Sequence, residues 1–246
     1  MPSSESREEA SGAPKLGTGR IVALLIVGTL AFLVLALIAP WAWQQLHPAP
    51  AGMATAASGL PWQIERLPEG GTRVFGLRPG QDRLGRIADL HPDNSLKLAL
   101  VKDEQGRLTL EGYVETLKAG FVQGKLVVTG AADPGTLQRW ADHNTAREPQ
   151  PSGAWRLSLD AQDEAEALQS MMTGMVFLPA ARFDEATAVE RFGPPAERRV
   201  TADGTVHLLY PDRGLVVALD PQGRGKPVLQ YVAPADFSRL SAPLGR

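Results

Sequence analysis

The chain contains few residues of the kinds that carry catalysis. A nucleophilic site needs a nucleophile, a general base and an orienting acid close together; the usual bases here are the four histidines at positions 47, 91, 143 and 207. No serine lies in a Gly-x-Ser-x-Gly or Ser-x-x-Lys pattern. Because the sequence has no cysteine, it excludes thiol nucleophiles, zinc–cysteine sites and disulfide bonds. The chain therefore has no recognisable catalytic motif.

A small metal site could form where Asp89, His91 and Asp93 lie close together in the sequence. The simpler interpretation is the end of a short helix, where the helix dipole favours a histidine near the free carbonyl groups. His143 has the same setting at the end of another predicted helix, and His207 alternates outward on a predicted strand. We therefore expect these histidines to lie at the surface, with no metal and no cofactor bound.

Two acidic pairs, Glu164/Glu166 and Asp184/Glu185, could supply the two carboxylates of a glycosidase. Both pairs fall in the first turns or on the exposed faces of predicted helices, where the helix dipole stabilises negative charge without any catalytic role. No glycine-rich loop followed by a lysine is present to bind phosphate. We therefore expect the protein not to be an enzyme.

Three residues are candidates for contacting a partner. Tyr113 falls on the charged side of a predicted strand, away from its leucine side, so its ring is expected to be exposed. Arg198 and Arg199 could meet an acidic partner, although a solvated strand edge is the simpler interpretation. Four other large side chains are expected in the core instead: Trp155, Phe177, Tyr210 and Tyr231.

One stretch of the sequence predicts that the protein is anchored in a membrane. Ile21 to Ala39 is an uninterrupted run of apolar and small residues without a charge. As a helix it would be about 28 Å long, close to the hydrocarbon thickness of a bilayer. Trp41 and Trp43 follow at once, where indoles favour the headgroup layer. Lysine and arginine occur before the run and are absent from residues 40–65, so we expect a cytoplasmic N-terminus and a single pass through the inner membrane.

A cleaved secretory signal is an alternative interpretation of this run. Ala54, Thr55 and Ala56 offer the small residues that a signal peptidase accepts. The apolar run is longer than the roughly 7–15 residues of a usual signal core. A membrane span is therefore the favoured interpretation.

Composition divides the chain into an anchor and an exported domain. Residues 1–20 are polar and predict a disordered cytoplasmic tail. Residues 21–43 predict the transmembrane helix, and the Pro/Ala/Gly/Ser-rich residues 44–59 predict a flexible linker. The exported part is expected to form a first α+β half at 60–145, a loop at 146–153 and a second α+β half at 154–246.

The predicted fold class is α+β, with an antiparallel sheet and short helices packed on one face. Alternating apolar residues and turn signals predict strands at 62–67, 72–77, 96–102, 108–115, 125–129, 155–159, 175–178, 197–201, 205–210, 215–220 and 228–232. Helical spacing and capping residues predict helices at 83–91, 134–144, 161–172 and 184–192, the first capped by Asp82. A helix followed by strands occurs at both 84–114 and 184–232, which suggests two helix-plus-meander repeats.

The charge pattern argues against nucleic acid as a partner. The net charge is −2, and acidic and basic residues are interspersed without a basic stripe.

The segment Ala186 to Tyr210, ATAVERFGPPAERRVTADGTVHLLY, combines a helix, a Phe-Gly-x-Pro turn and a hairpin that ends in tyrosine. It resembles the unit of the small outer-membrane-assembly lipoproteins and of β-lactamase-inhibitor-protein-like domains. The resemblance covers about a quarter of the exported domain and implies a non-enzymatic, protein-binding module of the cell envelope. The chain departs from the lipoproteins because it lacks the lipid-bearing cysteine. Its overall plan resembles uncharacterised single-pass envelope proteins of Gram-negative bacteria.

Together these patterns predict a membrane-anchored periplasmic protein that binds or scaffolds another envelope protein without catalysis. Two alternatives stay open: an envelope hydrolase with an unfamiliar site, and a domain that binds a lipid or a small ligand. An enzyme would need a pocket with converging polar groups, whereas a binding module would need an exposed apolar or aromatic patch or an open sheet edge.

Overall fold

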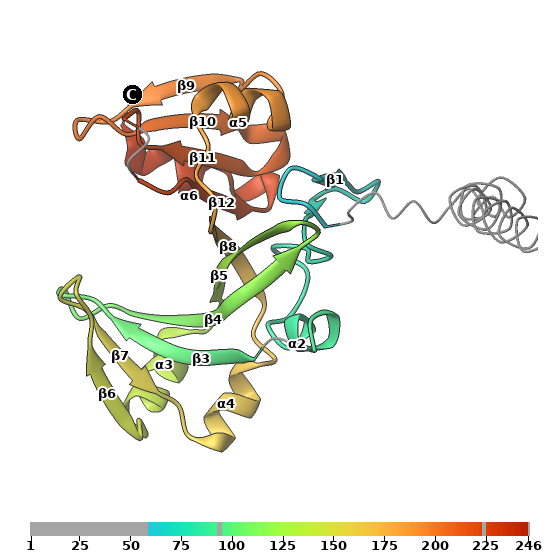
Figure 1. Cartoon of the computed structure of the whole chain (residues 1–246). Helices are drawn as coiled ribbons and strands as arrows, with labels where there is room; N and C mark the ends of the chain where they lie inside the picture. The colour runs from blue at the N-terminus through green and yellow to red at the C-terminus, as the bar shows by residue number, and fades with distance from the viewer. Residues whose placement is uncertain (1–58, 93–94, 223–224, 246) are drawn as a thin grey trace, which may run out of the picture. The chain divides into compact units, whose positions relative to one another are not determined.

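A single antiparallel sheet organises the structure, which is a computed structural model that describes residues 59–92, 95–222 and 225–245. Within these ranges ten strands pair in the order β6-β7-β3-β4-β5-β8-β12-β11-β10-β9 (Figure 1). All described residues belong to one compact unit, residues 57–246. The strands are β3 (Leu96–Lys102), β4 (Leu108–Ala119), β5 (Val122–Gly130), β6 (Ala146–Pro149), β7 (Trp155–Ser158), β8 (Met172–Pro179), β9 (Glu197–Val200), β10 (Val206–Tyr210), β11 (Leu215–Leu219) and β12 (Val228–Val232).

Short helices and one small hairpin complete the unit. The hairpin pairs β1 (Glu65–Arg66) with β2 (Thr72–Arg73). The α-helices are α2 (Arg86–Leu90), α3 (Pro134–Asp142), α4 (Ala161–Ala167), α5 (Glu185–Phe192) and α6 (Ser238–Ser241). Three 3₁₀ turns lie at Pro211–Arg213, Pro234–Asp236 and Ala242–Leu244. The predicted α+β class with a large antiparallel sheet and few short helices is therefore confirmed.

The core lies on one face of the sheet because alternate residues of each strand point to that side. Leu100 on β3 lies opposite Leu110 on β4, and Gly112 on β4 lies opposite Val128 on β5. A Cβ at Gly112 would come within 2.8 Å of the Val128 side chain, so this position requires glycine for packing. The same buried cluster includes a residue from each of α2, α3, α4 and α5: Ile87, Trp140, Ala167 and Phe192.

The C-terminal helix lies on the opposite face. Neighbouring residues of a strand point to opposite faces, and Arg198 on β9 bonds to Glu185 of α5. Arg199, the next residue, donates to the carbonyl oxygens of Ser241 and Gly245. The helices therefore cover both faces near β9, whereas the sequence predicts helices on one face.

Aspartates cap three helices, and the sequence predicts those at the starts of α3 and α4. Asp133, Asp160 and Asp184 each accept a hydrogen bond from a backbone N–H in the first turn, at 2.8 to 3.0 Å. Such bonds satisfy helix donors that lack an intrahelical partner. The predicted cap of α2 is wrong, because Asp82 instead accepts from the backbone and the guanidinium of Arg78.

The main difference in architecture concerns residues 146–153, which the sequence predicts to be a loop between two halves. Residues 146–149 form β6, which pairs with β7 along its whole length. Its side chains are exposed, so neither alternation nor apolar content reveals this strand in the sequence. The sheet runs through this region without interruption, and β5 of the first half pairs directly with β8 of the second.

The Phe-Gly-x-Pro segment joins α5 to its hairpin as the sequence predicts. Gly193 ends α5 with φ of 77°, a conformation that favours glycine. The hydroxyl of Tyr210, the last residue of β10, donates to the carbonyl of Gly193 at 3.0 Å. This bond ties the end of the hairpin to the end of the helix.

The predicted tail at 1–20, the predicted span at 21–43 and nearly all of the predicted linker at 44–59 lie outside the described residues. Among the described residues, no helix has both the length and the apolar composition that crossing a bilayer requires.

Candidate functional site

Tyr113 lies on the polar face of β4 and makes contacts within the protein. Its hydroxyl donates a hydrogen bond to the Glu111 carboxylate, and the Arg156 guanidinium lies 4.4 Å from the ring centroid. Burial and the bond to Glu111 raise the pKa of Tyr113 above its ordinary value. The ring is half-buried, so its accessible part is smaller than the sequence alone predicts. A role for Tyr113 in partner contact stays a prediction.

Arg198 and Arg199 are consecutive residues of β9, an edge strand of the sheet, and their side chains point to opposite faces. Arg198 makes two bonds to the Glu185 carboxylate, at 2.7 and 3.1 Å. Arg199 pairs with Glu197 and also holds the C-terminal segment. Both guanidinium groups are therefore engaged within the protein, and their contact with an acidic partner stays a prediction.

Two histidines that the sequence places at the surface are partly buried and contact other groups of the protein. The ring Nε2 of His91 lies 3.2 Å from the Phe75 carbonyl, and Asp89 pairs with Arg86. Asp93 lies outside the described residues, so the set Asp89, His91 and Asp93 is not described as a whole. His207 is partly buried with Nε2 at 3.2 Å from the Thr201 hydroxyl, and burial lowers its pKa.

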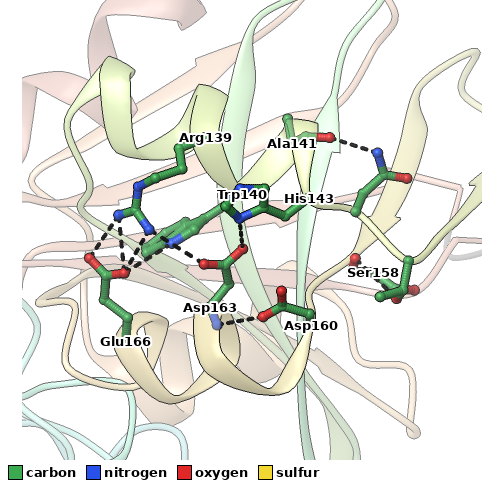
Figure 2. A network of polar contacts seen from close by, with 10 residues as sticks. Arg139, Trp140, Ala141, His143, Ser158, Asp160, Asp163 and Glu166 are labelled. Atoms are coloured by element: carbon green, nitrogen blue, oxygen red, sulfur yellow. Dashed lines mark hydrogen bonds and ion pairs between the residues drawn. The ribbon is translucent and has the colours of Figure 1, made fainter.

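A polar cluster between α3 and α4 brings together residues that the sequence analysis treated separately. Figure 2 shows Arg139, Trp140 and His143 from the α3 side reaching toward carboxylates at α4. The Arg139 guanidinium binds both Glu166 oxygens at 3.0 Å, and the Trp140 indole N–H donates to Glu166 at 3.3 Å. The sequence placed Glu166 on an exposed helix face, which is correct, but its partners come from another helix.

Asp163 is the centre of this cluster. Its side chain is only 2% exposed, and it accepts bonds from Arg139 at 3.4 Å and from Nδ1 of His143 at 3.1 Å. Its backbone N–H donates to the Asp160 carboxylate at 2.8 Å. A buried carboxylate is stable only when it is paired or hydrogen-bonded, and these two side chains supply that pairing.

The cluster has two possible chemical uses besides joining the helices. A buried aspartate that bonds Nδ1 of a histidine leaves Nε2 facing outward, as in a general base. Among the described residues, however, no hydroxyl or amine side chain bonds to His143. The ligand atoms of His143, Asp160 and Asp163 lie within 4.8 Å of one another, a spacing that could hold a metal ion. The Arg139 guanidinium already supplies the positive charge beside Asp163, so the geometry favours an ion-pair network.

An aromatic surface lies away from this cluster, at the turn between β4 and β5. Phe121 is 71% exposed, and its ring centroid lies 5.9 Å from the ring centroid of Trp62. Beside them is a hollow of about 150 Å³ with a mostly apolar lining: Pro61, Trp62, Val122, Pro179, Ala181, Arg182, Phe183, Thr187, Arg191, Phe192 and Leu229. We call Phe121 and this hollow the Phe121 patch.

An open polar groove of about 590 Å³ lies elsewhere on the unit. It includes Trp155, which is 43% exposed. The prediction that Trp155 packs in the core is therefore wrong, whereas Phe177, Tyr210 and Tyr231 are buried as predicted. Trp155 belongs to a four-residue strand near the sheet edge, where no helix covers it completely.

Comparison of the chain with protein-family models, curated proteins and solved structures gives no match.

Sequence reasoning missed Phe121 and the Asp163 cluster for different reasons. The predicted strands end before residue 119 and restart at 125, so the tight turn that exposes Phe121 was not located. A glycine followed by an aromatic residue, Gly120-Phe121, was the available signal. The partners of Asp163 lie 20 and 24 residues away in the sequence, and no local pattern reveals such a pairing.

Proposed function

We propose that this protein is a single-pass inner-membrane protein whose periplasmic domain binds another envelope protein without catalysing a reaction. The anchor in this proposal is the apolar run of residues 21–39 with its charge asymmetry. We also propose that the domain consists of two helix-plus-meander repeats. The order of elements supports this, since α2 precedes β3 and β4 as α5 precedes β9 to β12.

The observation that carries the binding role is the exposure of Phe121. Large aromatic side chains that remain exposed beside an apolar hollow are typical of protein interaction sites. Complete burial of a phenylalanine contributes about 1.5–3 kcal/mol. With 71% of the side chain still accessible, covering Phe121 would contribute about 2 kcal/mol, or about 30-fold in Kd.

The hollow and its charges define the partner's chemistry. A cavity of ~150 Å³ holds a benzene-sized group, so the hollow fits one large apolar side chain. The Arg191 guanidinium lies 5.3 Å from the Trp62 ring and pairs with Glu190 at a long 3.8 Å. Arg182 is exposed and has no ion pair or side-chain hydrogen bond within the described ranges. The expected partner therefore presents an apolar anchor residue flanked by carboxylates.

The sheet edges are a less suitable place for a partner. Edge strands attract additional strands unless charge, proline or short length prevents it. β6 has four residues and ends in Pro149, and β9 carries Glu197, Arg198 and Arg199. Both edges therefore carry features that discourage strand addition.

Photo-crosslinking in intact cells of the native host tests this proposal. A photoreactive residue at Arg182, within the Phe121 patch, should trap one dominant envelope protein, which mass spectrometry then identifies. The variant Phe121→Ser should reduce the yield about 30-fold at limiting partner concentration. Val200→Ser is the matched control, because Val200 is also apolar and 56% exposed but lies on β9.

Photoreactive residues at Tyr113 and Arg198 test the contacts that the sequence predicts. Trapping of no protein at any of the three positions would refute the binding role. An equal loss of yield in Phe121→Ser and Val200→Ser would refute the assignment to the Phe121 patch.

A further inference from the structure

The polar groove around Trp155 has the size of a small-molecule site and is separate from the Phe121 patch. Its volume of about 590 Å³ lies within the roughly 300–1,000 Å³ of small-molecule sites. Three parts of the fold form it: the end of α3, the turn between β3 and β4, and the β6–β7 hairpin. The lining residues are Lys102, Asp103, Glu104, Gly106, Leu108, Gln138, Ala141, Asp142, Asn144, Arg147, Gly153, Trp155 and Leu157.

The groove combines an apolar surface with unpaired polar groups. The Trp155 indole, partly exposed, lies on β7 opposite Lys102 of β3 and Pro149 of β6. Throughout 59–92, 95–222 and 225–245, Lys102, Glu104 and Arg147 have no side-chain hydrogen bond or ion pair. All three side chains are exposed, so their donors and acceptors are available to a ligand that enters the groove.

The neighbouring polar groups retain further capacity. Asp142 accepts one bond from the Gln138 amide at 2.8 Å, which leaves carboxylate lone pairs for another donor. Asn144 donates to the Ala141 carbonyl at 2.6 Å, and its own side-chain oxygen can still accept. A Cβ at Gly153 would overlap the Glu104 carboxylate, so glycine at this position leaves room for that carboxylate.

We infer that this groove binds an uncharged carbohydrate chain. A sugar ring has an apolar C–H face that can stack on an indole, and hydroxyl groups at its rim that both donate and accept hydrogen bonds. The groove offers donors at Lys102 and Arg147 and acceptors at Glu104 and Asp142. Because both signs of charge line it, a strongly anionic or cationic ligand would meet repulsion as well as attraction. The open shape suits a chain better than an enclosed monosaccharide.

The test uses the full chain in lipid nanodiscs and titrates it with chitotetraose, cellotetraose and maltotetraose. Binding is measured by calorimetry and by the ¹H–¹⁵N signals of the tryptophan indoles. We expect at least one tetrasaccharide to bind and to shift the Trp155 indole signal more than the other indole signals. Trp155→Ala should weaken that binding about tenfold or more, whereas Trp155→Phe should keep it within about threefold.

Two further variants separate this inference from the proposed protein partner. Arg147→Gln should weaken sugar binding severalfold through the loss of its donors, without changing the thermal unfolding midpoint. Phe121→Ser should leave sugar binding unchanged and lower only the crosslinking yield. The inference is overturned if none of the three sugars binds at millimolar concentration, if the Trp155 indole signal does not shift, or if folded Trp155→Ala binds as well as the native chain.

Discussion

Arg139 and Asp163 should contribute unequally to stability, because removing each one leaves a different partner behind. Arg139→Met leaves a carboxylate that is 2% exposed with only His143 as a side-chain partner. Asp163→Asn leaves Arg139 and His143, whose side chains are 42% and 52% exposed and can be hydrated. Arg139 also keeps its bonds to both Glu166 oxygens at 3.0 Å. The arginine variant should therefore be the more destabilised one.

The magnitudes follow from the exposure of the groups left behind. Removing one partner of a fully buried ion pair costs about 3–5 kcal/mol. The Arg139–Asp163 contact is long and Arg139 is only half-buried, so we expect about 2–3 kcal/mol for Arg139→Met. Asp163→Asn removes hydrogen bonds that hydration partly replaces, which costs about 1 kcal/mol. The double variant should lose about 2 kcal/mol, less than the sum, because it leaves no stranded buried charge.

Urea denaturation followed by tryptophan fluorescence measures these differences, and thermal unfolding provides a second readout. A change of 1 kcal/mol corresponds to about 2–4 °C in Tm for a unit of this size. Glu166→Gln is the control for an exposed pair and should cost no more than about 1 kcal/mol. If Asp163→Asn is at least as destabilising as Arg139→Met, the ion-pair interpretation is wrong. If EDTA lowers the Tm of the native chain, the ion-pair interpretation is also wrong, and His143, Asp160 and Asp163 bind a cation instead.

Three other predictions concern single residues. Tyr231→Phe removes the buried hydrogen bond to the Pro61 carbonyl, 2.9 Å long, and should cost about 1–2 kcal/mol in urea denaturation because that carbonyl loses its partner; an unchanged midpoint would contradict it. Gly214→Ala should cost about 3 kcal/mol, since φ is +62° and a Cβ would overlap the Val232 carbonyl; a stable variant would show that the turn can rearrange. Burial lowers the pKa of His207 in the folded protein. As pH falls below about 6.5, His207 therefore takes up a proton in the unfolded chain before it does so in the folded one. Because protonation then favours unfolding, the free energy of unfolding should decrease from pH 7.5 to 5.5. His207→Gln should reduce this decrease, and an identical pH dependence in the two proteins would exclude His207 as its source.

Much of the secondary structure follows from local patterns. β3 begins at Leu96 and ends at Lys102 as alternation predicts, and Asp133 and Asp160 lie at the starts of α3 and α4 as predicted. These features depend on residues within a few positions of one another, so the sequence carries the information directly. Strand ends were less well predicted: β4 continues to Ala119, past a register shift between Val114 and Leu117 that hides its apolar pattern.

Other features depend on contacts between distant residues. β6 forms because β7 offers it an edge to pair with, although its own residues are exposed. The sequence predicts that Asp82 caps α2, but the helix begins at Arg86 with Gly85 as its N-cap residue, and the Asp82 carboxylate binds the Arg78 guanidinium. Trp155 has the composition of a core residue and lies on a groove because the sheet ends close by.

The candidate sites also differ in whether local sequence or contacts between distant residues determine them. By itself the sequence determined the α+β class, the aspartates at the starts of α3 and α4, the absence of cysteine chemistry and the apolar run of residues 21–39, because each is a property of composition or of neighbouring positions. Only the tertiary structure decided that Asp163 is buried beside Arg139, that Phe121 is exposed beside Trp62 and that Trp155 lines a groove. Burial and pairing are set by which strands and helices meet, and those contacts join residues that are far apart in the chain.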